Sequence, residues 1–331
     1  MNSKTKNIIL WSIIAFLLTI IAVLGTVFDL QISKALADVQ FGENYHSTNL
    51  FAIIGETFGE NVLYIFIVIA FGILFFYLRR NSVLKKWLNI CLQIAIFIGS
   101  YIIAFYCLHK VLEYLSIYTN FGLDEYITST IGLISIALVS LAVNIGSFYL
   151  ISKISDQNIN RLWKWAIVVL IVAILSNGIV QFSKRIFDRT RYRAMVHIGD
   201  SEFKYFDYWF VFNTNKFSYA SPYFEDFFRS FPSGHTCAAA STFLLVLLPL
   251  FLPQTDNKKW KTIFWVSSIV YTVLIALCRL IAGAHFFMDV YVGGMVTFVI
   301  VMIAYCICLK LKQKEKDNEN TCMKRAKRTA C

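Results

Sequence analysis

The chain has 331 residues, of which 58% are hydrophobic, 16% aromatic and only 15% charged. This balance excludes an ordinary water-soluble globular protein and indicates an integral membrane protein. The formal net charge of +11 would suit a nucleic-acid-binding protein, but most of the basic residues flank apolar segments, where positive charge sets orientation in a membrane. We therefore expect membrane lipids as partners and no nucleic acid.

Eight apolar segments have about the 20 residues that a helix needs to cross a hydrocarbon core of about 30 Å. They cover residues 8–28, 62–78, 88–109, 129–152, 162–183, 234–252, 262–281 and 287–309. The first segment is too long for the core of a signal peptide and no A-x-A cleavage site follows it, so we expect it to remain as a span. The sequence predicts an all-α, polytopic membrane helix bundle with about eight transmembrane helices.

The segments follow one another without a Gly/Ser-rich or Pro-rich linker, which indicates one membrane domain. Along it we distinguish N-terminal transmembrane helices in residues 1–161, a motif-bearing region in residues 162–309 with a long loop at 184–232, and a basic tail in residues 310–331. Lys and Arg are retained on the cytoplasmic side of membrane proteins. This rule places both termini in the cytoplasm and the loop 184–232 on the outer side of the cell membrane.

The outer loop begins with KRIFDRTRYR, residues 184–193, in which five of ten residues are basic. A basic membrane anchor would explain such a run on the cytoplasmic side, but this run is predicted outside. An anion site is the alternative explanation. Arginine binds phosphate with two parallel hydrogen bonds, and lysine adds a compact positive charge.

The loop ends with FPSGHT, residues 231–236, directly before an apolar run. Ser233 is a suitable N-cap for a helix that starts here. The free N–H groups and the positive dipole end of such a helix attract anions, and Gly234 allows an anion to approach the backbone. His235 then lies in the first turn. The alternative is a simple helix cap with an interfacial histidine.

A third polar group occurs in CRLIAGAHFFMDV, residues 278–290, on the same predicted side. Charged residues at membrane depth are costly and usually functional. On a continuous helix His285 and Asp289 share one face, so the carboxylate can bond one ring nitrogen and leave the other as a base or nucleophile. Arg279 must be brought round by a turn at 282–284. A structural ion pair between Arg279 and Asp289 is the alternative.

These three groups resemble the signature motifs of the type 2 phosphatidic acid phosphatase superfamily, in its membrane-bound lipid phosphatase branch. The matching patterns are K-x6-R in residues 184–191, P-S-G-H in residues 232–235 and R-x5-H-x3-D in residues 279–289. Tyr192 stands where the family usually has proline, and Cys278 where it usually has serine. Neither departure removes a charged or imidazole group. The resemblance starts at about residue 162 and implies a six-helix phosphatase core, which leaves one N-terminal helix pair extra.

The resemblance also implies roles for eight residues. His285 attacks phosphorus to form a phosphohistidine, Asp289 orients and charges that imidazole, and His235 protonates the leaving oxygen before it activates water. The phosphate would be held by Lys184, Arg191, Ser233, Gly234 and Arg279. The resemblance implies no metal and no other cofactor.

An active site at the outer interface, beside an aromatic-rich loop, favours a substrate whose tail stays in lipid. We expect hydrolysis of a lipid phosphate monoester or a polyprenyl diphosphate. Three alternatives stay open: a phosphotransferase of the same superfamily with an alcohol acceptor, a transporter, and a non-catalytic lipid-binding protein. The motifs do not indicate an oligomeric state.

Overall fold

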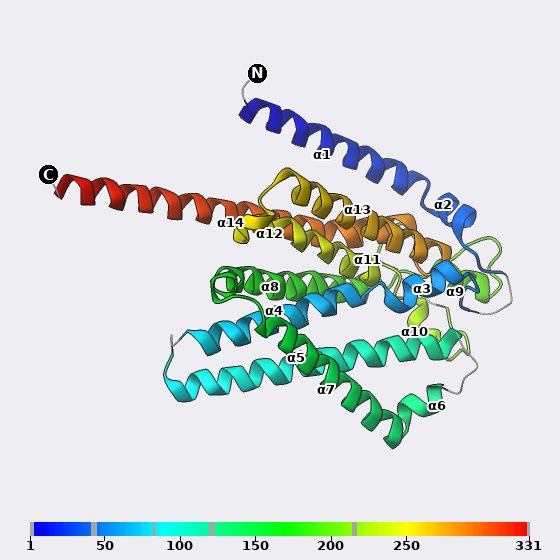
Figure 1. Cartoon of the computed structure of the whole chain (residues 1–331). Coiled ribbons are helices and arrows are strands. Elements are labelled where there is room, and N and C mark those ends of the chain that lie inside the picture. The colour runs from blue at the N-terminus through cyan, green and yellow to red at the C-terminus, as the bar shows by residue number, and fades with distance from the viewer. Residues whose placement is uncertain (1–2, 41–44, 82–83, 119–122, 214–216, 330–331) are drawn as a thin grey trace. The chain divides into compact units, whose positions relative to one another are not determined.

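The computed structural model describes residues 3–40, 45–81, 84–118, 123–213 and 217–329 of the chain. The protein is 80% helical, and the described residues form no strand, which confirms the all-α prediction. In chain order (Figure 1) the elements are α1 (Ser3–Val27), α2 (Asp29–Leu36), α3 (Leu50–Phe58), α4 (Asn61–Arg80), α5 (Lys86–Tyr118), α6 (Leu123–Thr128), α7 (Thr130–Ser152), α8 (Asp156–Phe187), α9 (Tyr192–His197), α10 (Phe224–Phe227), α11 (Gly234–Ala239), the 3-10 helix η1 (Ala240–Leu247), α12 (Leu248–Phe251), the 3-10 helix η2 (Pro253–Thr255), α13 (Lys258–Ile281) and α14 (Phe287–Thr329).

Seven helical stretches among the described residues are long and apolar enough to cross a membrane. They are Leu50–Arg80, Lys86–Tyr118, Thr130–Ser152, Asp156–His197, Gly234–Phe251, Lys258–Ile281 and Phe287–Lys314. An eighth is obtained if the pair Trp11–Val27 and Asp29–Leu36, bent by 77°, counts as one span. These apolar helices are those of a multi-pass membrane protein. The predicted tail continues α14 as far as Thr329, and its last two residues lie outside the described ones.

The described residues divide into two compact units, each built from distant parts of the chain. The first unit contains Met1–Glu60, Asn177–Ala238 and Thr272–Met295, and the second contains Asn61–Ser176, Ala239–Tyr271 and Val296–Cys331. All three sequence motifs belong to the first unit. The first unit therefore holds the candidate site.

The second unit has a large apolar core to which α4, α7, α8, η1, α13 and α14 contribute. Two buried hydrogen bonds add to it, from Trp165 Nε1 to the Leu244 carbonyl at 3.0 Å and from Ser268 Oγ to the Thr242 carbonyl at 2.9 Å. Buried polar groups with satisfied hydrogen bonds fix the packing of such a core. The second unit is thus a closely packed helical body.

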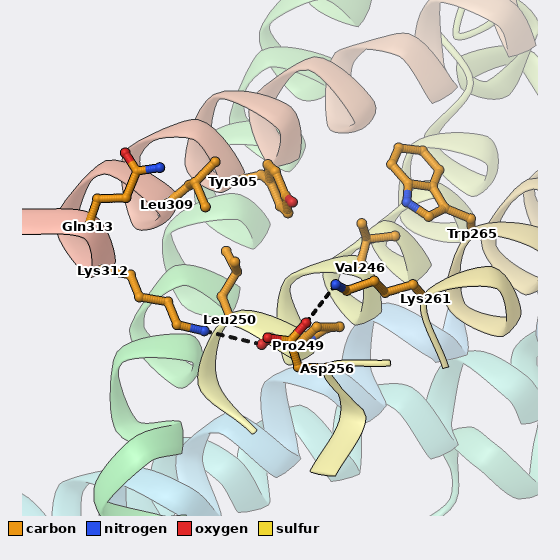
Figure 2. A pocket seen from close by; sticks show the side chains of 10 residues that line it. All are labelled: Val246, Pro249, Leu250, Asp256, Lys261, Trp265, Tyr305, Leu309, Lys312 and Gln313. Atoms are coloured by element: carbon orange, nitrogen blue, oxygen red, sulfur yellow. Dashed lines mark hydrogen bonds and ion pairs between the residues drawn. The ribbon is translucent and has the colours of Figure 1, made fainter. Parts of the chain in front are cut away.

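A cavity of about 300 Å³ lies within the second unit (Figure 2). The two lysines that line it already have partners: Lys261 pairs with Asp256 at 2.6 Å, and Lys312 donates to the Pro249 carbonyl at 3.4 Å. None of the motif residues lines this cavity. The cavity therefore shares no lining residue with the candidate site.

In the first unit, the break between α1 and α2 places a carboxylate among the motif residues. Asp29, the first residue of α2, is fully buried and accepts a hydrogen bond from Met288 N at 2.8 Å. Gly25 permits this approach, because a Cβ there would lie less than 3.0 Å from the Phe287 ring. The bend at Phe28 is thus accompanied by close contact between α1 and the start of α14.

Aromatic side chains of the loop 184–232 pack into two buried clusters. One contains Tyr192, Phe203 and Phe286, and the other contains Tyr45 and Phe227. Other aromatic side chains of the loop stay exposed, among them Phe210 at 54% and Phe212 at 57%. Many of the aromatic side chains of the loop are therefore part of its packing, and a smaller apolar part is exposed.

The two departures from the family motifs have clear structural settings. Tyr192 is the first residue of α9, a position where the N–H needs no helical partner and where proline is well accommodated; here its ring stacks on Phe203 with centroids 5.3 Å apart. Cys278 lies against α3, where its thiol donates to the Phe51 carbonyl at 3.2 Å and a Cβ on Gly55 would collide with it. Both residues therefore take part in packing within the first unit.

Candidate active site

All eight predicted site residues lie in the first unit and are described. Lys184 is near the end of α8, Arg191 directly precedes α9, and Ser233 directly precedes α11, which begins with Gly234 and His235. Arg279 is near the end of α13, His285 lies in the turn after α13, and Asp289 is in the first turn of α14. The tertiary fold thus brings the ends of five helices to one place.

His285 is almost completely buried, with 1% of its side chain exposed. Its Nδ1 is within hydrogen-bond distance of the Ser230 carbonyl oxygen. A carbonyl oxygen only accepts, so this contact places the ring proton on Nδ1. No described residue lies within hydrogen-bond distance of Nε2, whose lone pair is then available for attack.

The predicted hydrogen bond between His285 and Asp289 on one helix face is replaced by a longer contact. His285 precedes α14, which begins at Phe287, and its Nδ1 lies 3.9 Å from Asp289 Oδ2. This distance exceeds that of a hydrogen bond. Asp289 therefore acts on the ring through its nearby charge, while the Ser230 carbonyl accepts the hydrogen bond.

Asp289 is held by three donors. Its carboxylate accepts from Phe286 N at 2.9 Å, from Ser230 Oγ and from Arg189. Arg189 also donates to Asp29 at 2.7 Å and is 1% exposed. The expected alternative for Asp289, a structural pair with Arg279, does not form; its partner is Arg189.

The electrostatic setting favours a neutral imidazole at His285. Burial lowers the pKa of His285 well below its ordinary value, and the charges of Arg191 and Arg279 act in the same direction, whereas Asp289 opposes them. A neutral ring with the proton on Nδ1 is the form that attacks an electrophile through Nε2. The geometry and the pKa thus point to the same state of the ring.

Ser233 caps α11 as expected and joins the second motif to the third. Its Oγ accepts from Thr236 N at 3.4 Å, and its own N–H donates to the Asp289 carbonyl at 2.9 Å. The close approach requires a glycine on α14, because a Cβ on Gly293 would lie less than 3.0 Å from the Ser233 carbonyl. Backbone contacts therefore fix the spacing between the two motifs.

His235 is held at both ring nitrogens by residues near the N-terminal part of the chain. Its Nδ1 lies 2.9 Å from Glu60 Oε1 and its Nε2 lies 2.9 Å from the Glu56 carbonyl oxygen. Both partners are acceptors, so the two contacts together fit a ring that carries a proton on each nitrogen. This is the form that can donate a proton.

The remaining predicted phosphate ligands gather near the same acids. A Cβ placed on Gly234 would lie 3.7 Å from Lys184 Nζ and 3.6 Å from Glu60 Oε1, so these groups are close neighbours. Arg279 is 2% exposed and its Nη1 lies 2.8 Å from Glu56 Oε1. The basic groups of the site are therefore balanced by carboxylates.

Arg191 is fixed by the loop that precedes FPSGHT. Its Nε donates to the Asp226 carbonyl at 2.9 Å, its Nη2 to Asp226 Oδ1 at 2.8 Å and its Nη1 to the Ala284 carbonyl at 3.2 Å. Burial acts to raise the pKa of Asp226, but the charges of Arg191 and Arg193 prevail and lower it. The contact with Ala284 places Arg191 next to His285.

Several residues of this cluster were not among the predicted ones. They are Asp29, Glu56, Glu60, Arg189, Arg193, Asp226 and Ser230. A sequence signal existed for the acids of the N-terminal part, since Asp29, Glu56 and Glu60 lie on the same predicted side of the membrane as the motifs. Among the described residues, no three His, Cys, Asp or Glu side chains are arranged to hold a metal ion.

Comparison with known families agrees with this site. Residues 165–313 match the family model described as PAP2 superfamily. The matched part includes all three motifs, and the match supports membership of this superfamily. The superfamily generally comprises phosphatases, which supports a phosphoester hydrolase. No solved structure gives a significant match to the chain.

Proposed function

We propose that this protein is an integral membrane phosphatase that hydrolyses a lipid phosphate monoester or a polyprenyl diphosphate at the outer membrane face, through a phosphohistidine and without metal. The observation that carries the proposal is the convergence of the three motifs around His285. Its Nδ1 is occupied by the Ser230 carbonyl, and its Nε2 has no described partner.

The reaction would proceed in two steps. His285 Nε2 attacks phosphorus and the bond from phosphorus to the leaving oxygen breaks, while His235 gives a proton to that oxygen. Water then attacks the phosphohistidine, His235 takes a proton from it, and phosphate leaves as the P–N bond breaks. The Asp289 carboxylate, 3.9 Å from Nδ1, stabilises the positive charge that His285 gains on attack.

The basic residues would hold the phosphoryl oxygens, where charge develops. A guanidinium has five N–H donors, and Arg191 uses three in its contacts with Asp226 and Ala284. Donors therefore remain for a ligand. Lys184 Nζ, close to Gly234, supplies a positive charge at the backbone position assigned to the anion.

A lipid substrate is supported by the surroundings of the site. Among the described residues, seven helical stretches, or eight if the bent pair counts as one span, are long and apolar enough to cross a membrane. The loop 184–232 also keeps exposed aromatic rings such as Tyr208, Phe210 and Phe212. Amphipathic and aromatic side chains favour the interface between lipid and water. A substrate with its phosphate in water and its tail in lipid suits this setting.

The test is phosphate release by the purified protein in EDTA, with phosphatidic acid, phosphatidylglycerophosphate, undecaprenyl diphosphate and soluble phosphates as substrates. We expect release from a lipid phosphate, inhibition by vanadate, and a fall in kcat of about 10³-fold or more in His285→Ala, because the nucleophile is lost. His109→Ala, in α5 of the second unit, is the matched control and should keep its activity.

Two results would speak against the proposal. Full turnover in His285→Ala would show that His285 is not the nucleophile. Transfer of phosphate to a supplied alcohol, in place of release to water, would identify a phosphotransferase.

A further inference from the structure

The imidazole of His235 is held by a part of the chain that lies outside the family match. Glu56 and Glu60 belong to the first sixty residues, whereas the match covers residues 165–313. The backbone carbonyl of Glu56 takes one ring nitrogen and the carboxylate of Glu60 takes the other, both at 2.9 Å. Two residues at the end of α3 and in the turn that follows it therefore fix the orientation of the ring.

The two acids have different tasks. The Glu56 carboxylate lies 2.8 Å from Arg279 and 3.2 Å from Arg193, so its charge is directed to arginines. The Glu60 carboxylate contacts His235, and the charges of Lys184 and Arg279 also act on it. Glu60 is thus the carboxylate that faces the imidazole, with basic groups on its other sides.

Burial makes the contact between Glu60 and His235 specific. The His235 side chain is 5% exposed and that of Glu60 is 23% exposed. A charge-assisted hydrogen bond in such surroundings is shorter and stronger than one between neutral groups. It stabilises the protonated ring and keeps the ring in a single orientation.

We propose that Glu60 is a positioning residue for His235, which holds the imidazole in its protonated form for transfer of a proton to the leaving oxygen. The inference rests on the proposed function and extends it to a residue that the family motifs do not contain. In this step the Nε2–H group exchanges the Glu56 carbonyl for the leaving oxygen and gives it the proton as the P–O bond breaks; Nε2 then regains a proton from the water that attacks the phosphohistidine. Glu60 keeps its hydrogen bond to the ring and transfers no proton itself.

The experiment compares two substrates that differ in their need for an acid. An alkyl phosphate such as phosphatidic acid needs a proton on its leaving oxygen, whereas p-nitrophenyl phosphate has a leaving group that departs as an anion. General acid catalysis contributes about 10²–10⁴-fold. We expect Glu60→Gln to lower kcat for the alkyl phosphate by about 10- to 100-fold and for p-nitrophenyl phosphate by less than about 3-fold.

Four comparison variants complete the test. His235→Ala should show the same difference between the two substrates, and the double variant with Glu60→Gln should lose no more than His235→Ala alone. Glu60→Asp, which keeps the carboxylate, should restore part of the activity on the alkyl phosphate. Glu113→Gln, on α5 of the second unit, should match the wild-type protein on both substrates.

The outcomes separate this inference from the proposed function. Equal losses of Glu60→Gln on both substrates, or a lower KM with unchanged kcat, would overturn the positioning role; the second result would make Glu60 a competitor of the phosphate. If the wild-type protein releases phosphate and Glu60→Gln keeps full kcat on the alkyl phosphate, only the role of Glu60 is rejected. Absence of release by the wild-type protein counts against the proposed function itself.

Discussion

Arg189 is a buried positive charge of the candidate site, enclosed by two buried carboxylates. Its guanidinium lies between Asp29 and Asp289, with the three side chains 1% exposed or less, and over the Phe286 ring at 4.2 Å from the centroid. Removal of one member of such a buried set leaves an uncompensated charge. Arg189 therefore links stability to the placement of Asp289.

We predict that Arg189→Met lowers the free energy of unfolding by about 3–5 kcal/mol, because Asp29 and Asp289 lose their shared partner. Thermal unfolding in detergent measures the change. Lys204→Met is the matched control, since Lys204 pairs with Glu202 at the surface with 70% of its side chain exposed, and exposed substitutions change stability by about 0.5 kcal/mol or less. Equal shifts in the two variants would contradict the role of Arg189.

The reactive side chains of the candidate site could be proposed from the sequence, but their hydrogen-bond partners could not. The motif spacing identified His285, His235 and Asp289, because imidazole and carboxylate groups are rare near membrane spans. The hydrogen bond from His285 to the Ser230 carbonyl depends on a backbone atom that is the same in every residue type. Sequence patterns carry no sign of such a contact, and the same holds for the Glu56 carbonyl on His235.

At the scale of elements, α14 lies close to the segment that carries the second motif. Gly293 lies in the second turn of α14, against the Ser233 carbonyl, whereas the side chain of a residue at Gly294 would meet Thr236 and Thr272 at 3.4 and 3.6 Å. The first contact leaves no room for a methyl group, and the second is an ordinary van der Waals distance. The two adjacent glycines of α14 should therefore differ in their tolerance of substitution by alanine.

We predict that Gly293→Ala strongly lowers activity and stability, because Ser233 and Asp289 must separate to admit the methyl group. Gly294→Ala should be tolerated, with the gain of up to about 1 kcal/mol that alanine brings to a helix interior. Phosphate release and thermal unfolding of the two variants test this directly. Equal tolerance of both substitutions would show that the two motifs are not fixed by this approach.

Most spans were predictable because hydrocarbon thickness demands long apolar runs. The predicted segments 62–78, 129–152 and 262–281 correspond to α4, α7 and α13 with ends that differ by a few residues. The bend after Val27 and the short helices α3 and α9 were not predicted. Their positions depend on contacts of Asp29, Glu56 and Arg191 with distant residues, which local apolar periodicity does not encode.

At the scale of the whole molecule, the distribution of basic residues predicts which ends face the cytoplasm. We expect a reporter fused to either terminus to be active in the cytoplasm, and a reporter inserted in the exposed part of the loop near Phe210 to be active only on the outer side. The physical reason is the retention of Lys and Arg on the cytoplasmic side. The opposite pattern would invert the proposed location of the active site.

The acids of the first sixty residues have a consequence for modularity. Asp29 and Glu56 form ion pairs with Arg189, Arg193 and Arg279. Three buried arginines of the motif region therefore depend on carboxylates from the first sixty residues. A boundary drawn by family likeness at residue 165 would divide pairs of opposite charge in a buried setting. We therefore expect a chimaera that takes only one of these two regions from a relative to fold poorly, unless the relative's region also carries the matching acidic or basic residues.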